Sequence, residues 1–288
     1  MTRSSTNPQS AFSLRGKLKY LLSFGLLLAL SSESLGEPRY QCGAGCPGRF
    51  YLGVFGGTGK SDSDHFTQRG VALFPDIIGG PLIIDGAGNS DHYSTPTYGI
   101  HVGYEYLGLF NCHNSWNLFP AAELEGFSLR GTQKGFLANP SARLPEHNFL
   151  DTLPMRSKFL FANAVFAVET PLARTVQPYV GVGIGMARQS ISGADSLQLD
   201  PPEPGVNHFN SDPDDSDDAV SVQGKVGLRF APFCHARFFV EYRLVHLAST
   251  NYVFGPTEYP THAETSDWNV KLNDVNYHLF TLGIDLLT

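Results

Sequence analysis

The stretch that decides the fold is Pro178-Tyr179-Val180-Gly181-Val182-Gly183-Ile184-Gly185-Met186-Ala187. Large apolar side chains occupy every second position from Val180 to Met186, and glycine or alanine fills the positions between them. Successive side chains of a β-strand point to opposite faces, so this period predicts a strand with one apolar face. About ten residues is also the length of a tilted strand that crosses a bilayer.

Seven further stretches alternate in the same way, and the connections between the strands are alternately long and short. The predicted strands cover residues 49–60, 97–106, 116–130, 156–170, 177–190, 219–230, 236–249 and 275–287. This rhythm is typical of an up-and-down barrel in an outer membrane. We therefore predict an all-β fold, an eight-stranded antiparallel transmembrane β-barrel with four long outer loops and short periplasmic turns. A soluble sandwich or lipocalin-like barrel would instead have short loops of similar length and an inward apolar face.

Residues 1–36 have the features of a secretory signal peptide. Arg15, Lys17 and Lys19 precede an apolar run over residues 20–30, and small residues follow up to Gly36. The alternatives are a buried helix or a membrane anchor, but the run is shorter than the roughly 20 residues of a spanning helix. The predicted organisation is a cleaved signal over 1–36, a periplasmic segment over 37–48 and the barrel over 49–288. This places the protein in a bacterial outer membrane.

Charge narrows the class of partner. The whole chain has a net charge of −7, and removal of residues 1–36 lowers it to about −10 because four basic residues and one acidic residue are lost. An acidic surface argues against nucleic-acid binding. We expect no cofactor, a monomer, and contact with outer-membrane lipid and lipopolysaccharide.

Several further segments carry a family resemblance. They are residues 50–57 (Phe-Tyr-Leu-Gly-Val-Phe-Gly-Gly), 178–185, 226–230 (Val-Gly-Leu-Arg-Phe), 239–243 (Phe-Val-Glu-Tyr-Arg) and 277–284 (Tyr-His-Leu-Phe-Thr-Leu-Gly-Ile). In this order and spacing the chain resembles the small eight-stranded outer-membrane β-barrel family, which includes the OmpA-like transmembrane barrels and is often called the porin family. The resemblance implies insertion by the outer-membrane assembly machinery. Members usually end on an aromatic residue, whereas this chain ends Leu286-Leu287-Thr288.

Charged residues alternate with the apolar face and are predicted to share the lumen. They are His101, Glu105, Glu123, Glu125, Lys225, Arg229, Glu241, Arg243 and Asp285. An eight-stranded barrel is wide enough only for side chains to fill, and enclosed charges must pair or remain hydrated. A salt-bridged plug is the favoured interpretation, and a narrow gated ion path is the alternative.

An acidic run lies in the third long connection. Asp212, Asp214, Asp215, Asp217 and Asp218 could hold Ca²⁺ or Mg²⁺, which favour clustered carboxylates. The run lacks the glycine and the closing glutamate of an EF-hand. A solvated surface loop is therefore the favoured interpretation, and no resident metal is predicted.

An enzymatic alternative comes from barrels that deacylate lipid A with a His and a Ser two residues apart on the lipid face. The nearest candidate here is His246, but Ala248 shares its face and Ser249 points the other way. A nucleophile and its base must lie within hydrogen-bond reach. We therefore predict no enzymatic activity.

The predicted role is structural or in surface interaction, with a small channel as the alternative and an adhesin as a third class. The outer loops carry aromatic residues that could contact an external ligand or host surface: Phe66, Phe74, Tyr93, Phe136, Phe209 and Tyr259. These rings could equally pack on one another.

The four cysteines all fall at the predicted periplasmic end. Cys42 and Cys46 precede the first strand, and Cys112 and Cys234 lie in short turns. The periplasm is oxidising, so disulfides persist there. Zinc is the alternative, but three residues separate Cys42 from Cys46, whereas zinc-binding cysteines are usually two residues apart. We expect Cys42 and Cys46 each to bond one of the turn cysteines, which would tie the N-terminal segment across the mouth of the barrel.

Overall fold

The computed structural model describes residues 48–107, 110–112, 116–139, 148–169 and 175–288. The predicted signal peptide, most of the segment over 37–48, and both Cys42 and Cys46 lie outside these residues. The sequence prediction for them therefore stays a prediction.

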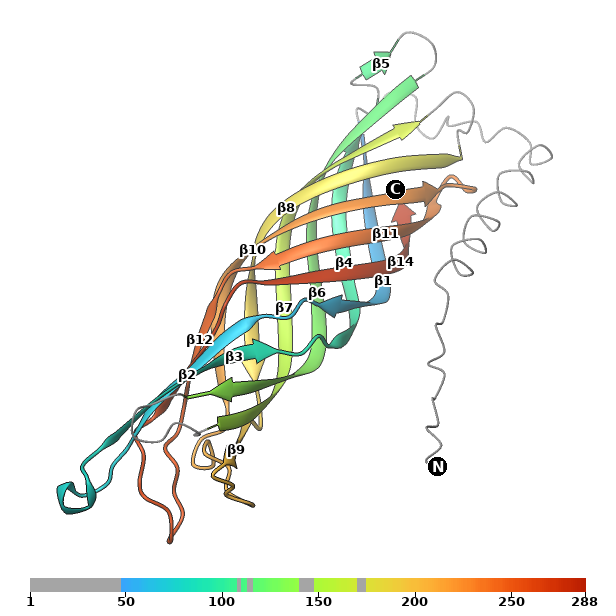
Figure 1. Ribbon diagram of the computed structural model, residues 1–288. Coiled ribbons are helices and arrows are strands. Elements are labelled where there is room, and N and C mark those ends of the chain that lie inside the picture. Colours follow the sequence, from blue (N-terminus) through green and yellow to red (C-terminus); the bar gives the residue numbers. More distant parts are fainter. Residues whose placement is uncertain (1–47, 108–109, 113–115, 140–147, 170–174) are drawn as a thin grey trace, which may run out of the picture. The chain divides into compact units, whose positions relative to one another are not determined.

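Eight antiparallel strands close into a ring (Figure 1). They are β1 (Gly48–Ser61), β4 (Ser94–Tyr106), β6 (Trp116–Ala138), β7 (Asn148–Glu169), β8 (Val176–Ile191), β10 (Asp215–Phe230), β11 (Ala236–Leu247) and β14 (Val275–Leu287). The ring closes where β1 pairs with β14 from Tyr51 and Leu287 to Ser61 and Tyr277. Each predicted strand overlaps one of these eight, so the fold class is confirmed.

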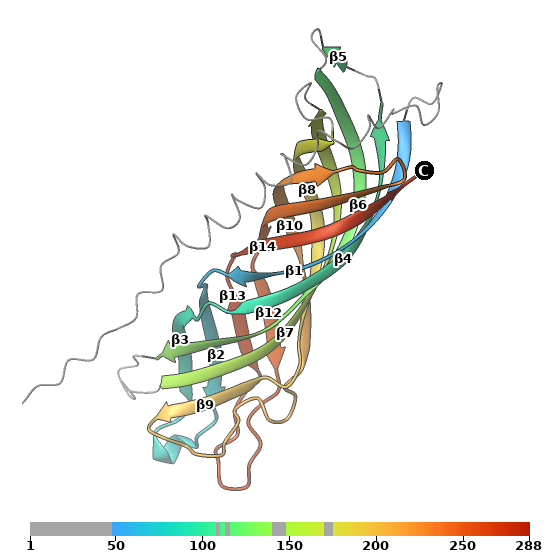
Figure 2. The same ribbon diagram turned by 90° about the vertical axis from the view of Figure 1, so that its right-hand side faces the viewer.

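The two ends of the ring differ. Short connections and both ends of the described barrel, Gly48 and Thr288, lie at one end, where the Thr288 amide donates to the Phe50 carbonyl (3.1 Å). The short strand β5 (Phe110–Cys112) also lies there, and Figure 2 shows it at the opposite end from β9 (Asp195–Asp200). Outer-membrane barrels have short turns on the periplasmic side, so the other end is extracellular.

The long connections contain strands that the sequence prediction did not identify. They contain β2 (His65–Ala72), a 3₁₀ turn (Asp76–Ile78), β3 (Leu82–Ser90), β9, β12 (Thr250–Phe254) and β13 (Trp268–Leu272). These strands pair in the order β12-β13-β2-β3-β6-β7-β9, using parts of β6 and β7 that run beyond the residues predicted for them. We call this sheet the extracellular extension.

The extension forms because its strands alternate as the wall strands do. Phe66, Gln68, Gly70 and Ala72 of β2 are buried, and the residues between them face outward. Frequent glycines and polar outward residues hide this alternation in the sequence. Aromatic and aliphatic side chains fill the space enclosed by the extension: Phe66, Leu82, Ile84, Leu137, Phe149, Leu153, Phe209, Tyr252, Phe254 and Trp268.

The ring is apolar outside and polar or aromatic inside. On β8, Val180, Val182, Ile184 and Met186 are each more than half exposed, and the residues between them line the lumen. Exposed aliphatic side chains recur on all eight wall strands. Such a belt is the surface that a bilayer covers. The described residues contain no helix long and apolar enough to cross a membrane.

Candidate functional site

The periplasmic half of the lumen holds a cluster of three cations around one carboxylate. Glu105 on β4 accepts from Arg49 on β1 (2.6 Å), Arg229 on β10 (3.0 Å) and Arg237 on β11 (2.8 Å). The four strands meet here because an eight-stranded barrel is narrow enough for long side chains to span it. Glu105 and Arg237 have no exposed surface.

Asp285 on β14 extends this cluster. Its carboxylate accepts from Arg237 Nε (2.6 Å) and lies 2.7 Å from Nε2 of His101. Because an ionised carboxylate only accepts, the hydrogen bond requires a proton on His101 Nε2. One guanidinium therefore bridges two carboxylates from different strands.

A second cluster lies next to the first. Lys225 on β10 contacts Glu123 (2.5 Å) and Glu125 (3.0 Å) on β6 and approaches Glu241 on β11 (3.8 Å). Arg243 on β11 bonds both Glu125 and Glu241. Three carboxylates thus share two cations in a fully buried group.

Neutral donors and aromatic rings complete the network. Tyr51 donates to Glu123 and Tyr179 donates to Glu241, each over 2.9 Å. The Arg237 guanidinium lies 4.7 Å from the centre of the Tyr51 ring, and that of Arg229 lies 4.5 Å from the centre of the Tyr179 ring. Cations over aromatic faces gain further stabilisation when they are desolvated.

The paired charges of the lumen are therefore equal in number. The paired carboxylates are Glu105, Glu123, Glu125, Glu241 and Asp285, and the paired cations are Arg49, Lys225, Arg229, Arg237 and Arg243. Towards the extracellular end the filling becomes aromatic, with the Phe127 and Phe159 rings stacked at 4.8 Å. The core of the extension follows beyond that layer.

All nine residues predicted for the lumen are buried there and bonded to one another or to neighbouring lumen residues. The sequence interpretation missed Arg49, Arg237, Tyr51 and Tyr179. Arg237 has the same strand phase as Glu241 and Arg243, and Arg49 has the phase of Tyr51. The alternation that found the other charges therefore also predicts these four.

A second feature lies on the outside of the wall. Arg130, Arg156, Lys158 and Arg188 are exposed on β6, β7 and β8, at the extracellular edge of the apolar belt, and we call them the basic row. Arg130 is directly opposite Arg156, and Lys158 is directly opposite Arg188. Like charges directly opposite each other destabilise a sheet, so this arrangement favours an anionic ligand.

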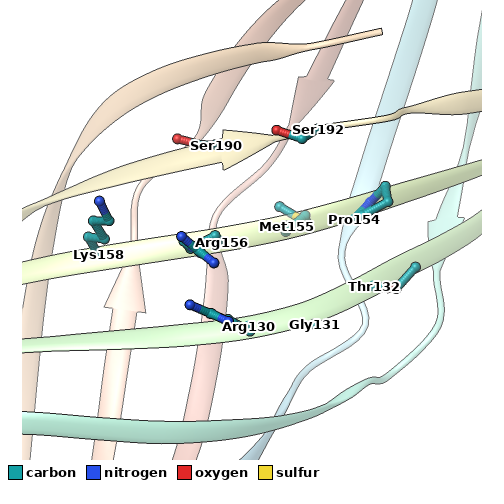
Figure 3. A pocket seen from close by; sticks show the side chains of 9 residues that line it. All are labelled: Arg130, Gly131, Thr132, Pro154, Met155, Arg156, Lys158, Ser190 and Ser192. Carbon is teal, nitrogen blue, oxygen red and sulfur yellow. The ribbon is translucent and has the colours of Figure 1, made fainter.

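A recess of about 640 Å³ adjoins the basic row. Figure 3 shows Arg130 on one strand and Arg156 and Lys158 on the next, with Ser190 and Ser192 beside them. Arg188 is also 3.5 Å from Asp218, but both side chains are more than half exposed. Exposed pairs of this kind contribute little to stability.

The acidic run mostly serves the backbone. Asp214 accepts from the Gly193 amide, Asp215 from the Val253 amide and Asp217 from the Asn251 amide. Asp215, Asp217 and Asp218 belong to β10 rather than to a loop. These bonds hold β12 alongside the end of β10, and Asp212 lies in the connection before that strand.

The predicted loop aromatics mostly pack rather than project. Phe66 and Phe209 are fully buried in the extension, Phe74 packs against the same core, and Tyr93 packs against the lumen core. The Tyr259 hydroxyl accepts from the Asn207 amide (3.1 Å). Phe136 is about half exposed, which makes it the accessible member of this group of six.

His246 and the cysteines were the other candidates. His246 Nδ1 bonds Asn276 Oδ1 (3.0 Å), and no hydrogen bond joins its ring to Ser249 among the described residues. Cys234 is exposed and forms no disulfide with a described residue. Because the side chains of its predicted partners lie outside the described residues, the cysteine pairing stays a prediction.

Neither a family model nor a curated protein matches the sequence. Among solved structures, the chain is similar to Neisserial surface protein A (15% identity, 82% of this chain and 96% of that one, TM-score 0.38). It is also similar to OprG from Pseudomonas aeruginosa (11%, 83% and 95%, TM-score 0.41). A third similar structure is the outer-membrane protease OmpT from Escherichia coli (10%, 86% and 100%, TM-score 0.40).

The surface of the barrel itself decides the class. Its exposed aliphatic belt requires lipid around it, and its polar residues are enclosed and paired within the lumen. Antiparallel strands in a closed ring leave no unpaired edge in the bilayer. The chain is an eight-stranded outer-membrane β-barrel protein.

Proposed function

We propose that this protein is a closed barrel that anchors a rigid extracellular extension, with a structural or surface-interaction role rather than a role in transport. The observation that carries the proposal is the pairing of five carboxylates with five cations across the lumen. A channel of this width would need its charges along the wall with water between them. Here the pairs Lys225–Glu123 and Arg237–Glu105 join strands that are not neighbours in the wall, so they cross the lumen.

The cost of opening this lumen supports closure. Removing one member of a buried ion pair leaves an uncompensated charge, at a cost of about 3–5 kcal/mol. A permeating ion would have to separate several such pairs and also displace the aromatic layer of Phe127 and Phe159. The gated ion path therefore has no supporting feature among the described residues.

The extension supports a surface role. Its interior is packed as a core of its own, while Leu73, Ile77 and Ile83 are exposed around the tip of the β2–β3 hairpin. Exposed apolar groups gathered at one place mark interaction sites. We infer that this tip is the surface that meets an external partner.

The basic row favours one membrane component as a second partner. It lies on the lipid-facing side at the extracellular edge of the belt, which is the level of the outer-leaflet headgroups. Lipopolysaccharide carries phosphate groups at that level, and arginine binds phosphate oxygens with paired donors. We infer that Arg130, Arg156 and Lys158 bind these phosphates.

A vesicle-swelling assay tests the closure. Purified barrel is reconstituted into lipid vesicles that are then diluted into an isotonic solution of a small uncharged sugar. The proposal predicts swelling no faster than that of protein-free vesicles, with a general diffusion porin as the positive control. Sugar-driven swelling that rises with the amount of barrel would refute it.

A further inference from the structure

Three side chains converge where two extracellular connections meet. Glu203 and His208 lie between β9 and β10, and His262 lies between β12 and β13. The Glu203 carboxylate oxygen Oε2 is 3.2 Å from His262 Nε2 and 3.5 Å from His208 Nε2. One donor atom from each residue lies within 4.8 Å of the other two.

The other ring nitrogen of each histidine fixes the tautomer. His208 Nδ1 lies 2.9 Å from the Ser196 carbonyl, and His262 Nδ1 lies 2.6 Å from the Ala263 carbonyl. A carbonyl oxygen only accepts, so each Nδ1 carries a proton and donates. In the neutral ring each Nε2 then presents a lone pair to the Glu203 carboxylate. A cation between the three atoms would satisfy these lone pairs and the carboxylate together, whereas a doubly protonated ring would instead donate from Nε2 to Glu203.

The dimensions and chemistry fit zinc. With Zn–N and Zn–O bonds of about 2.0–2.1 Å, two ligands of a tetrahedral site are about 3.3 Å apart. The two donor separations of 3.2 and 3.5 Å bracket that value. Imidazole nitrogens select zinc-like transition metals over Ca²⁺ and Mg²⁺, which prefer oxygen. A histidine that donates its second nitrogen to a backbone carbonyl is also the usual arrangement of a metal ligand.

The surroundings hold the donors in place and leave access. His208 is buried, with the rings of Phe149 and Trp268 edge-on at 5.2 and 5.8 Å. Its backbone carbonyl accepts from the Thr257 hydroxyl (2.9 Å), which links the two connections. Glu203 is one-third exposed and His262 is partly exposed, so the open side of the site faces solvent.

We propose that Glu203, His208 and His262 bind a zinc ion that joins the β9–β10 connection to the β12–β13 connection on the cell surface. The three donors fill three positions of a tetrahedral site. The fourth position faces solvent and takes water or a donor from a partner. The site is independent of whether the barrel conducts.

Metal titration of the full barrel in detergent tests the proposal. After treatment with EDTA and dialysis, ZnCl₂ is added and binding is followed by calorimetry. Co²⁺ then serves as a spectroscopic probe, because tetrahedral Co²⁺ absorbs strongly in the visible. We expect about one zinc ion per chain. His262→Ala should weaken binding by at least about 100-fold, because loss of an outer-shell partner alone costs 10–100-fold.

Two further variants make the result specific. Glu203→Gln keeps the shape of the side chain and removes its charge, so it should also weaken binding. His246→Ala removes a histidine 3.8 Å from Asp274 that has no second imidazole in its group, so zinc binding should be unchanged. Circular dichroism must show the same strand content in every variant. Absence of zinc binding at 100 µM ZnCl₂ by well-folded wild type would overturn the proposal, as would equal binding by wild type and His262→Ala.

Discussion

The ammonium of Lys225 lies 2.5 Å from the carboxylate of Glu123, although β10 and β6 are separated in the wall by β7 and β8. The bond therefore crosses the lumen instead of running along the wall. Arg229 and Arg237 likewise reach Glu105 from strands that do not neighbour β4, and these contacts across the lumen are the basis of the proposed closure.

Lys225→Gln should lower the free energy of unfolding by about 3–5 kcal/mol, because Glu123 and Glu125 lose a shared buried cation. Urea unfolding of the refolded protein in detergent measures the change. Lys158→Gln is the matched control: it removes the same charge from the exposed outer face and should change stability by less than about 0.5 kcal/mol. Equal effects of the two substitutions would contradict the packed network.

Gly103→Ala should destabilise the barrel by about 1–3 kcal/mol. A Cβ at this position would collide with the Tyr51 ring, whose hydroxyl donates to Glu123, so the ring could not move without breaking that bond. Gly224→Ala is the control because a Cβ there meets no atom within 4 Å. Thermal unfolding compares the two. An equal shift of both midpoints would show that Tyr51 is not held against Gly103.

Asp151 should make the stability of the extracellular extension depend on pH. Burial raises the pKa of this carboxyl to about 8, although a hydrogen bond from Ser196 has the opposite, smaller effect. Between about pH 4 and pH 8, Asp151 therefore keeps its proton in the folded protein but has lost it in the unfolded chain. Stability should fall as pH rises from about 4 to about 8 and then level off.

Asp151→Asn should remove that decline, so that the variant is more stable than wild type at pH 8 but not at pH 4. The fluorescence of buried Trp268, in a Trp116→Phe background, reports unfolding of the extension because the chain has two tryptophans. Asp85→Asn, at an exposed carboxylate paired with Arg69, is the control. A wild-type stability that is flat between pH 4 and pH 8 would argue against a protonated Asp151.

The double variant Arg156→Gln, Lys158→Gln should bind lipopolysaccharide about 30-fold more weakly, at about 1 kcal/mol per basic residue near an anionic surface. The matched control Arg69→Gln, Lys271→Gln changes the net charge equally on the extension. Binding is measured by fluorescence titration with intact and with dephosphorylated lipopolysaccharide. Wild type that binds both forms equally would exclude phosphate as the ligand.

The sequence predicts the ring well because each wall strand carries an unbroken alternation, as on β8 from Val180 to Met186. The same alternation places Glu241 and Arg243 in the lumen and extends to Arg237. It does not predict which charges pair, because the bond between Lys225 and Glu123 depends on strand positions around the ring.

The extracellular extension was hidden for a different reason. Its strands are short, and in β3 glycine and polar residues interrupt the alternation, so a single strand of this kind carries a weak signal. The sequence carries even less signal for the proposed zinc ligands Glu203, His208 and His262. His262 is separated from Glu203 and His208 by more than 50 residues, and it becomes their neighbour only when the β9–β10 and β12–β13 connections pack together.

Single-channel recording in planar bilayers tests the central claim most directly, because small ions are a more stringent probe of closure than sugars. Wild-type barrel inserted into the bilayer is held at potentials of either sign in KCl. A lumen closed by paired charges and by the Phe127–Phe159 layer predicts a baseline without steady openings. Steady, voltage-independent current steps that require the folded barrel would contradict the account.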